Sequence, residues 1–220
     1  GHLIQMAEAV GQRGKVIGFE AVPELIGRTR ETIDAHYRHV ESRIVLHNVA
    51  VSDYSGTTSF FFSQMNDSGL SGMARRAVIE EGPVEELRVP VETIDKLLEG
   101  EDLSKLTFAK FDIEGAEFAA LRGASRALEK CPLLTFEWDQ TAPVYFHYDP
   151  PALYEWLRGR GYRIYDPFSF SYEDGDEFVA ARVWNFVAIA DALDPAEVLR
   201  PAQTTLHQLY PSVFELPLDG

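Results

Sequence analysis

The sequence has 220 residues, of which 45% are hydrophobic and 25% charged, a composition typical of a soluble globular protein. Its 35 acidic and 20 basic side chains give a net charge of −15, which argues against nucleic acid or an anionic membrane surface as a partner. The single cysteine, Cys131, excludes an intrachain disulfide and indicates a reducing compartment. No run of eighteen apolar residues and no leader-like start is seen, so we expect a cytoplasmic protein.

Hydrophobic spacing alternates between the helical and the strand period along the first hundred residues. The predicted helices are 1–10, 23–40 and 93–98, and the predicted strands are 15–20, 43–51, 57–62 and 87–91. Proline at position 23 suits the first turn of a helix. Residues 53–91 are interpreted as an excursion from the main sheet, a β-hairpin carrying a polar, glycine-containing loop at 63–72.

The second half continues this alternation and closes with a helical and irregular tail at 191–220. The predicted elements are a strand ending at Phe111, helices 117–130 and 152–160, strands 132–138, 162–165, 168–172 and 183–190, and an acidic turn at 173–177. Alternating helices and strands predict an α/β fold, a mostly parallel sheet with helices on both faces, in a single domain.

The stretch FAKFDIEGAE places three carboxylates directly after an apolar strand. Asp112, Glu114 and Glu117 lie within six positions, just before a helical pattern begins at Phe118. Ligands of open α/β sheets bind outside the carboxyl ends of strands, so this edge is a candidate active site. The alternative is that Glu114 and Glu117 only stabilise the following helix through its dipole, by roughly 0.3 to 1 kcal/mol each.

Other predicted strands also end in acids. Glu20 closes strand 15–20, and Glu137 and Asp139 close strand 132–138. An acid at the position of Glu20 is where a doubly wound nucleotide-binding fold binds ribose hydroxyls, although a strand-end acid is also common without that role.

Five separate blocks recur here in the order of one family. They are VIGFEAVPE, HNVAVSDYSG, VPVETIDKLL, FAKFDIEGAEFAALRGA and LLTFEW, and the resemblance that they carry covers about residues 1–190. This set resembles the FkbM-type methyltransferases, S-adenosylmethionine-dependent enzymes on the class I Rossmann-like fold. The resemblance implies the same fold, cofactor and activity for this chain.

The resemblance also implies roles for individual residues. Glu20 would hold the cofactor ribose with Ala21 beside it, Asn48, Val49 and Ala50 would line the adenine, and Asp112 would face the methionine end near the reacting methyl. Gly1 would be the last glycine of the glycine-rich loop that follows the family's first strand. That strand would lie upstream and between the strands ending at Glu20 and Asp112, so we expect further upstream residues in the working protein, because two ladders would otherwise be unpaired.

The implied reaction is attack of an alcohol oxygen on a sulfonium methyl, which is assisted by a general base. Candidates for the base are Asp112, Glu137, Asp139 and His147, although His147 also reads as a surface or packing histidine. Alternatively, Asp112 with Glu137 or Asp139 would bind Mg²⁺, which favours oxygen ligands and lowers the pKa of an alcohol.

An aromatic group around Trp138 predicts an apolar floor for an acceptor, with core packing as the alternative. Its members are Trp138, Tyr145, Phe146, Tyr148, Phe168, Phe170 and Tyr172. The predicted function is O-methylation of a small-molecule hydroxyl, on a sugar or polyketide-type natural product, by a chain that can form a homo-oligomer. The alternatives are a catalytically silent binding domain of the same fold and an NAD-dependent oxidoreductase, which would need a GxGxxG before Glu20.

Overall fold

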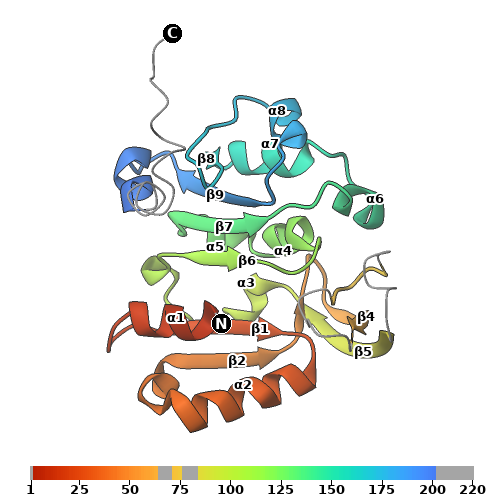
Figure 1. The fold of residues 1–220 in the computed structure, drawn as a ribbon, viewed down its shortest axis with the longest axis vertical. Coiled ribbons are helices and arrows are strands. Elements are labelled where there is room, and N and C mark those ends of the chain that lie inside the picture. The colour runs from red at the N-terminus through yellow and green to blue at the C-terminus, as the bar shows by residue number, and fades with distance from the viewer. Residues whose placement is uncertain (1, 64–70, 76–83, 202–220) are drawn as a thin grey trace, which may run out of the picture. The chain divides into compact units, whose positions relative to one another are not determined.

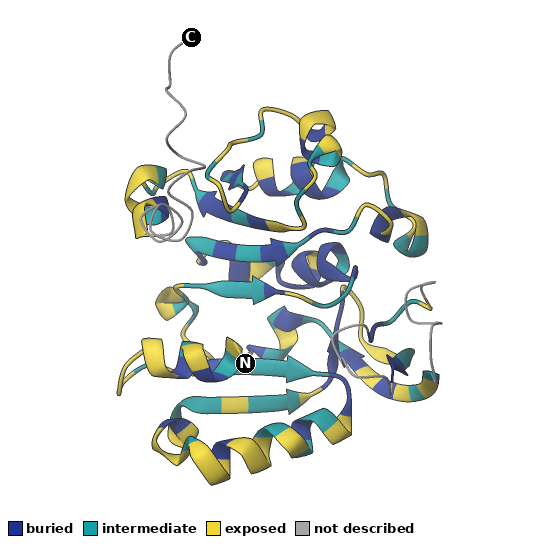
Figure 2. Cartoon of the chain, in the orientation of Figure 1, coloured by how far each residue is buried: buried dark blue, intermediate teal, exposed yellow. Residues whose placement is uncertain are grey.

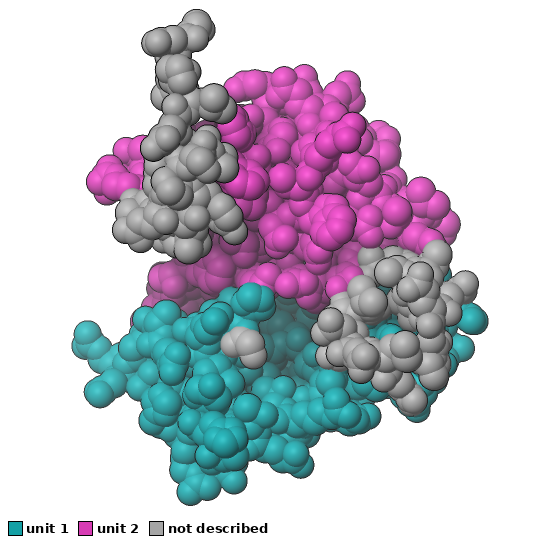
Figure 3. All heavy atoms as spheres, in the orientation of Figure 1, with its two compact units in different colours: residues 1–99, 119–124 teal, residues 100–118, 125–220 magenta. Residues whose placement is uncertain are grey.

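The computed structural model describes residues 2–63, 71–75 and 84–201, and their strands form three hydrogen-bonded sheets (Figure 1). The chain divides into two compact units (Figure 3). Unit 1 comprises residues 1–99 and 119–124, and unit 2 comprises residues 100–118 and 125–220. The predicted single domain over 1–220 stays a prediction.

Unit 1 begins with two parallel strands, each preceded by a helix or helical turn. Helix α1 is His2–Ala9, β1 is Val16–Glu20, α2 is Pro23–His36, and β2 is Ile44–Asn48. These four elements match the predicted order. The second predicted helix ends at His36 rather than Val40, because the chain tightens into the 3₁₀ helix η1, Arg38–Arg43, which buries Val40 against Ala7 and Val16.

A second sheet of unit 1 has the order β3-β5-β4. Strand β3 is Ala50–Val51, β4 is Gly56–Ser63, and β5 is Val84–Glu92. Strands β4 and β5 are antiparallel, as in the predicted hairpin, and β5 also pairs in parallel with β3, in a sheet separate from β1 and β2. Most of the predicted loop, 64–70, and residues 76–83 lie outside the described residues.

The predicted strand 43–51 is divided at Val49. Its N–H donates to the main-chain oxygen of Glu20 at 3.0 Å, after which the chain turns from β1 to pair with β5. Helix α3, Ile94–Leu97, follows β5 and is capped by the Thr93 side chain, close to the prediction.

Unit 2 contains a four-stranded sheet with the order β6-β7-β9-β8. Strand β6 is Ala109–Phe111, β7 is Leu133–Glu137, β8 is Tyr162–Tyr165, and β9 is Asn185–Ala190. The short 3₁₀ helix η4, Leu103–Lys105, precedes β6. Only β6 and β7 are parallel, and β9 runs antiparallel to both β7 and β8. The α/β class is confirmed, whereas the described strands form mixed sheets instead of the mostly parallel one predicted. Among the described residues, β1 and β6 each pair with a single strand.

The helices after β6 depart from the prediction at several places. The predicted helix 117–130 is divided into two helices: α4 is Glu117–Gly123 and α5 is Ser125–Leu128. Further along the chain, α6 is Ala142–Phe146, α7 is Ala152–Arg158, and α8 is Gly175–Ala180. The predicted acidic turn at 173–177 instead begins α8, whose first turn is capped by the Asp174 side chain.

The predicted strand 168–172 is wrong. The Asp166 side chain accepts hydrogen bonds from the N–H groups of Phe168 and Phe170, which folds this segment into a turn. A single bridge between Tyr165 and Ser171 is the only strand-like pairing that the described structure shows there.

The aromatic group that was predicted to form an acceptor floor is dispersed. Trp138 and Tyr172 pack against Phe178 in the core of unit 2, while Tyr148 packs edge-on against Phe118. The side chains of Phe168 and Phe170 are exposed instead. Burial on the inner positions of β7 and β9 is visible in Figure 2. Core packing therefore accounts for part of this group.

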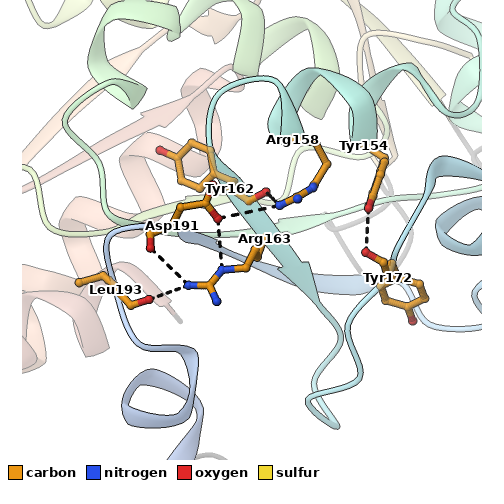
Figure 4. Close-up of polar contacts among 7 residues, drawn as sticks. All are labelled: Tyr154, Arg158, Tyr162, Arg163, Tyr172, Asp191 and Leu193. Carbon is orange, nitrogen blue, oxygen red and sulfur yellow. Dashed lines mark hydrogen bonds and ion pairs between the residues drawn. The ribbon is translucent and has the colours of Figure 1, made fainter.

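Strands β8 and β9 are tied at one end by charged side chains (Figure 4). Asp191 forms ion pairs with Arg163 at 3.2 Å and Arg158 at 4.0 Å, and Arg163 also donates to the main-chain oxygen of Leu193. Beyond β9, residues 195–201 are helical, and the rest of the predicted tail lies outside the described residues. In the part of the chain that is described, no helix is long and apolar enough to cross a membrane.

Candidate functional site

The carboxyl ends of β1 and β2 bring Glu20 and Asn48 together in unit 1, where they lie opposite each other in the parallel register. The Asn48 Nδ2 donates to the main-chain oxygens of Glu20 at 2.8 Å and Ala21 at 3.0 Å. The Val22 N–H donates to Oε1 of Glu20 at 2.8 Å. Burial raises the pKa of Glu20, while backbone hydrogen bonds oppose that shift. Glu20 is therefore held in one orientation as a hydrogen-bond acceptor.

The other residues assigned to the cofactor in unit 1 are less accessible. Val49 and Ala50 are 7% and 6% exposed, and Ala50 packs in a small core cluster with Ala21 and β5. Asn48 is exposed, so it has the most accessible side chain of the three adenine candidates. Gly1 lies outside the described residues.

A second group of carboxylates lies in unit 2, where the parallel strands β6 and β7 end. One carboxylate oxygen from each of Asp112, Glu114 and Glu137 lies within 4.8 Å of the others. Lys110 Nζ forms an ion pair with Asp112 at 2.8 Å. The predicted pairing of Asp112 with Glu137 is thus observed, with Glu114 as the third member. We call these three residues the acidic cluster.

The loop that carries the acidic cluster has an unusual backbone. Glu114 has φ 59° and Gly115 has φ 98°, both in the left-handed region. A Cβ at position 115 would lie 3.1 Å from Cε2 of Phe146 and 3.3 Å from Cβ of Ala142. Glycine is therefore required here both for its backbone conformation and for the close packing of α6.

Glu117 anchors this loop from inside unit 2. Its side chain is 2% exposed, and its Oε1 accepts a hydrogen bond from the Ile113 N–H at 2.8 Å. Burial raises the pKa of Glu117 to about 8. The alternative interpretation, in which Glu117 only stabilises the helix from its first turn, did not include this contact. The sequence position is the same whether the side chain is exposed beside the helix end or buried and bonded to the Ile113 N–H.

The electrostatics of the acidic cluster favour a bound proton. Burial raises the pKa of Glu137 to about 7, and the negative charges of Asp112 and Glu114 act in the same direction. Lys110 opposes this shift. A carboxyl group that titrates near neutral pH is suited to exchange protons with a ligand.

The remaining candidates for a general base lie outside the acidic cluster. Asp139 accepts a hydrogen bond from the Thr141 N–H at 2.7 Å, just before α6. His147 is exposed and ends α6 in a left-handed conformation, with φ 55°. Asp139 and His147 thus lie at opposite ends of the short helix α6.

Sequence reasoning gave Lys110 no role and did not predict the buried contact of Glu117. Lys110 points its ammonium at Asp112, and Glu117 holds the Ile113 N–H. The alternation of a strand gave a signal for Lys110, because residues two apart lie on the same face. The burial of Glu117 depends on which residues pack around it in the folded chain, so no pattern in the sequence indicated it.

Comparison with known proteins identifies the family. The family profile described as "Methyltransferase FkbM domain" matches residues 2–164, a range that includes Glu20, Asn48 and the acidic cluster. No curated protein matches the chain. A crystal structure of the methyltransferase FkbM from Methylobacillus flagellatus KT is similar, with 18% sequence identity, a TM-score of 0.46 and coverage of 86% of this chain. The chain spans 41% of that protein. From the profile match, this chain belongs to the FkbM methyltransferase family.

Proposed function

We propose that this chain is an S-adenosylmethionine-dependent O-methyltransferase of the class I Rossmann-like type, which acts on a hydroxyl of a small molecule. The observation that carries the proposal is the family match over residues 2–164, which spans both sets of strand-end acids. A hydroxyl acceptor is favoured because its oxygen has to lose a proton, and the acidic cluster offers a group that titrates near neutral pH.

The residues around Glu20 suit the ribose of the cofactor. A ribose presents two neighbouring hydroxyl donors, and a carboxylate fixed by a backbone N–H is a matching acceptor. Asn48 would hold the main chain of Glu20 and Ala21 in place rather than bind the cofactor itself, since its Nδ2 is already bonded to their carbonyl oxygens. When bound, the cofactor supplies a methyl group on a positively charged sulfur.

In unit 2, we propose that Glu137 accepts the proton of the acceptor hydroxyl, with Asp112 as its partner. Burial and the negative charge of Asp112 raise the pKa of Glu137 to about 7, so near neutral pH a substantial fraction of Glu137 is ionised and able to accept a proton. A base at this pKa contributes about 10² to 10⁴ to a rate. The alternative is that the acidic cluster binds Mg²⁺, for which three carboxylates offer suitable oxygen ligands. Chelator-treated protein distinguishes them, because the base requires no added Mg²⁺ for turnover.

The proposal is tested by calorimetric titration of S-adenosylhomocysteine and, separately, NAD into the chain. Saturable binding of S-adenosylhomocysteine but not NAD is expected, followed by methyl transfer from S-adenosylmethionine to members of a panel of hydroxyl compounds. Binding without any turnover would favour the catalytically silent domain. Binding of NAD alone would move the assignment to the oxidoreductase.

A further inference from the structure

A surface depression of unit 2 lies between the segment that follows β7 and the segment that precedes β9. It has a volume of about 460 Å³ and is lined by Gln140, Ala180, Arg182 and Trp184. These residues come from the segment after β7 and from the end of α8 and the approach to β9. The proposed chemistry assigns no role to any of them.

The β-sheet register places this depression at the edge where β7 ends. Glu137 pairs with Asn185 across β7 and β9, and one step further the Trp138 N–H donates to the main-chain oxygen of Trp184 at 2.8 Å. Gln140 follows Glu137 by three residues. A ligand in the depression therefore lies at the same strand ends as a member of the acidic cluster.

The depression offers an aromatic face and a fixed acceptor. Trp184 is 68% exposed, which is unusual for so large an apolar side chain. The Gln140 Nε2 donates to the main-chain oxygens of Val179 at 3.3 Å and Ala181 at 3.1 Å. Those two bonds define the amide orientation and leave Oε1 as an acceptor for a hydroxyl.

Arg182 adds a positive charge without a protein counter-ion. Among the residues that the structure describes, it makes no ion pair and no hydrogen bond through its guanidinium, in a chain with a net charge of −15. Arg158 and Arg163 of the same unit are both paired with Asp191 (Figure 4). A guanidinium presents several donors in one plane and binds carboxylate or phosphate in a bidentate manner.

We propose that this depression is the acceptor subsite, and that it binds a sugar ring carrying an anionic group, a carboxylate or a phosphate. Trp184 packs against the apolar C–H face of the ring, Gln140 accepts from a ring hydroxyl, and Arg182 binds the anion. The identity of the ligand as an acceptor rests on the proposed methyltransferase function, whereas the binding itself does not.

The test is an NMR titration of the full chain with D-glucuronate, glucose 6-phosphate and glucose. The indole N–H signal of Trp184, assigned by its loss in Trp184→Ala, reports binding. At least one anionic sugar is expected to bind about tenfold more tightly than glucose, and to lose that advantage in Arg182→Gln. The two anionic sugars distinguish a carboxylate-bearing ligand from a phosphate-bearing one.

Matched variants control for charge and for exposed aromatic area. Lys130→Gln removes one exposed positive charge elsewhere in unit 2, and Tyr54→Ala removes an exposed ring of unit 1; both are expected to bind like the unaltered chain. Trp184→Ala, followed through the ligand signals, is expected to weaken all three sugars. Equal affinity for glucose and both anionic sugars, or an unchanged preference in Arg182→Gln, overturns the subsite.

A parallel titration with S-adenosylhomocysteine separates the two proposals. Cofactor binding without anionic-sugar binding overturns the subsite and leaves the methyltransferase function standing. Anionic-sugar binding that depends on Arg182, without cofactor binding, supports the subsite and overturns the assigned role in methyl transfer.

Discussion

Glu20 in unit 1 and the acidic cluster in unit 2 both place carboxylates at the ends of parallel strands, yet their surroundings differ. Glu20 is a single acid, fixed by the Val22 N–H and supported by Asn48. The acidic cluster holds three carboxylates, and burial together with the negative charges of Asp112 and Glu114 raises the pKa of Glu137 to about 7.

The different surroundings of the two sites suit the two proposed roles, cofactor binding for Glu20 and proton transfer for the acidic cluster. A carboxylate that is fixed by a backbone N–H keeps its orientation, which suits it to accept hydrogen bonds from hydroxyl groups. Carboxylates that crowd together share protons, so their charge responds to pH and to a ligand. Position at a strand end and a pKa raised by burial are thus common to Glu20 and Glu137, and the neighbouring carboxylates distinguish Glu137.

The largest expected effect is on Glu20. Glu20→Ala removes an acceptor for two ribose hydroxyls, and we expect the affinity for S-adenosylhomocysteine to fall about a hundredfold or more by calorimetry. Glu24→Gln, an exposed acid four residues further along, is the control and should bind normally. If Glu20→Ala binds as well as the unaltered chain, the ribose role of Glu20 is wrong.

The next largest effect concerns Glu117 and the pH dependence of the free energy of unfolding. Because the folded-state pKa of Glu117 is raised to about 8, its protonated form is favoured on folding, and its stabilisation is lost as pH rises from about 4.5 through 8. Glu117→Gln stays neutral and keeps an oxygen for the Ile113 N–H. We expect it to gain roughly 3 kcal/mol in free energy of unfolding, relative to the unaltered chain, between pH 5 and pH 8.

Urea denaturation at several pH values measures this change. Glu129→Gln, at an exposed glutamate after α5, is the control and should leave the pH dependence unchanged. A parallel shift of the Glu117→Gln curve at all pH values would contradict the buried, protonated state of Glu117.

A smaller effect is expected for the support of Glu20. Asn48→Ala removes the two hydrogen bonds to the main-chain oxygens of Glu20 and Ala21, and should weaken S-adenosylhomocysteine binding about tenfold. Asn48→Asp should weaken it further, because its carboxylate would face two carbonyl oxygens. Calorimetry on both variants checks the order, and equal affinities would remove Asn48 from the support of this site.

The smallest expected effect concerns the pKa of Glu137 in the acidic cluster. Asp112→Asn removes a negative charge beside Glu137, so the pKa of Glu137 should move from about 7 towards its ordinary value. Carbon-13 NMR of labelled glutamate carboxyl groups measures it, and Asp53→Asn in unit 1 is the control. An unchanged titration of Glu137 would show that the charge of Asp112 does not contribute to its raised pKa.

Much of the local structure could be predicted because it depends on short-range patterns. Apolar spacing located β1, β7 and β9 to within two residues, and Pro23 marked the first residue of α2. The same patterns predicted that Asp112 and Glu137 meet, because β6 and β7 are parallel and end at one edge.

Tertiary structure decided what depends on distant partners. The direction of β9 depends on the path of the chain between strands, and the break at Val49 depends on which strand is available to pair with β3. Packing also assigned Trp138 to the core and left Trp184 exposed, although both are tryptophans next to a strand. By itself the sequence determined the family, the main elements and the strand-end acids; burial and neighbouring charge, which only the folded chain creates, set Glu117 and Glu137 apart from the other carboxylates.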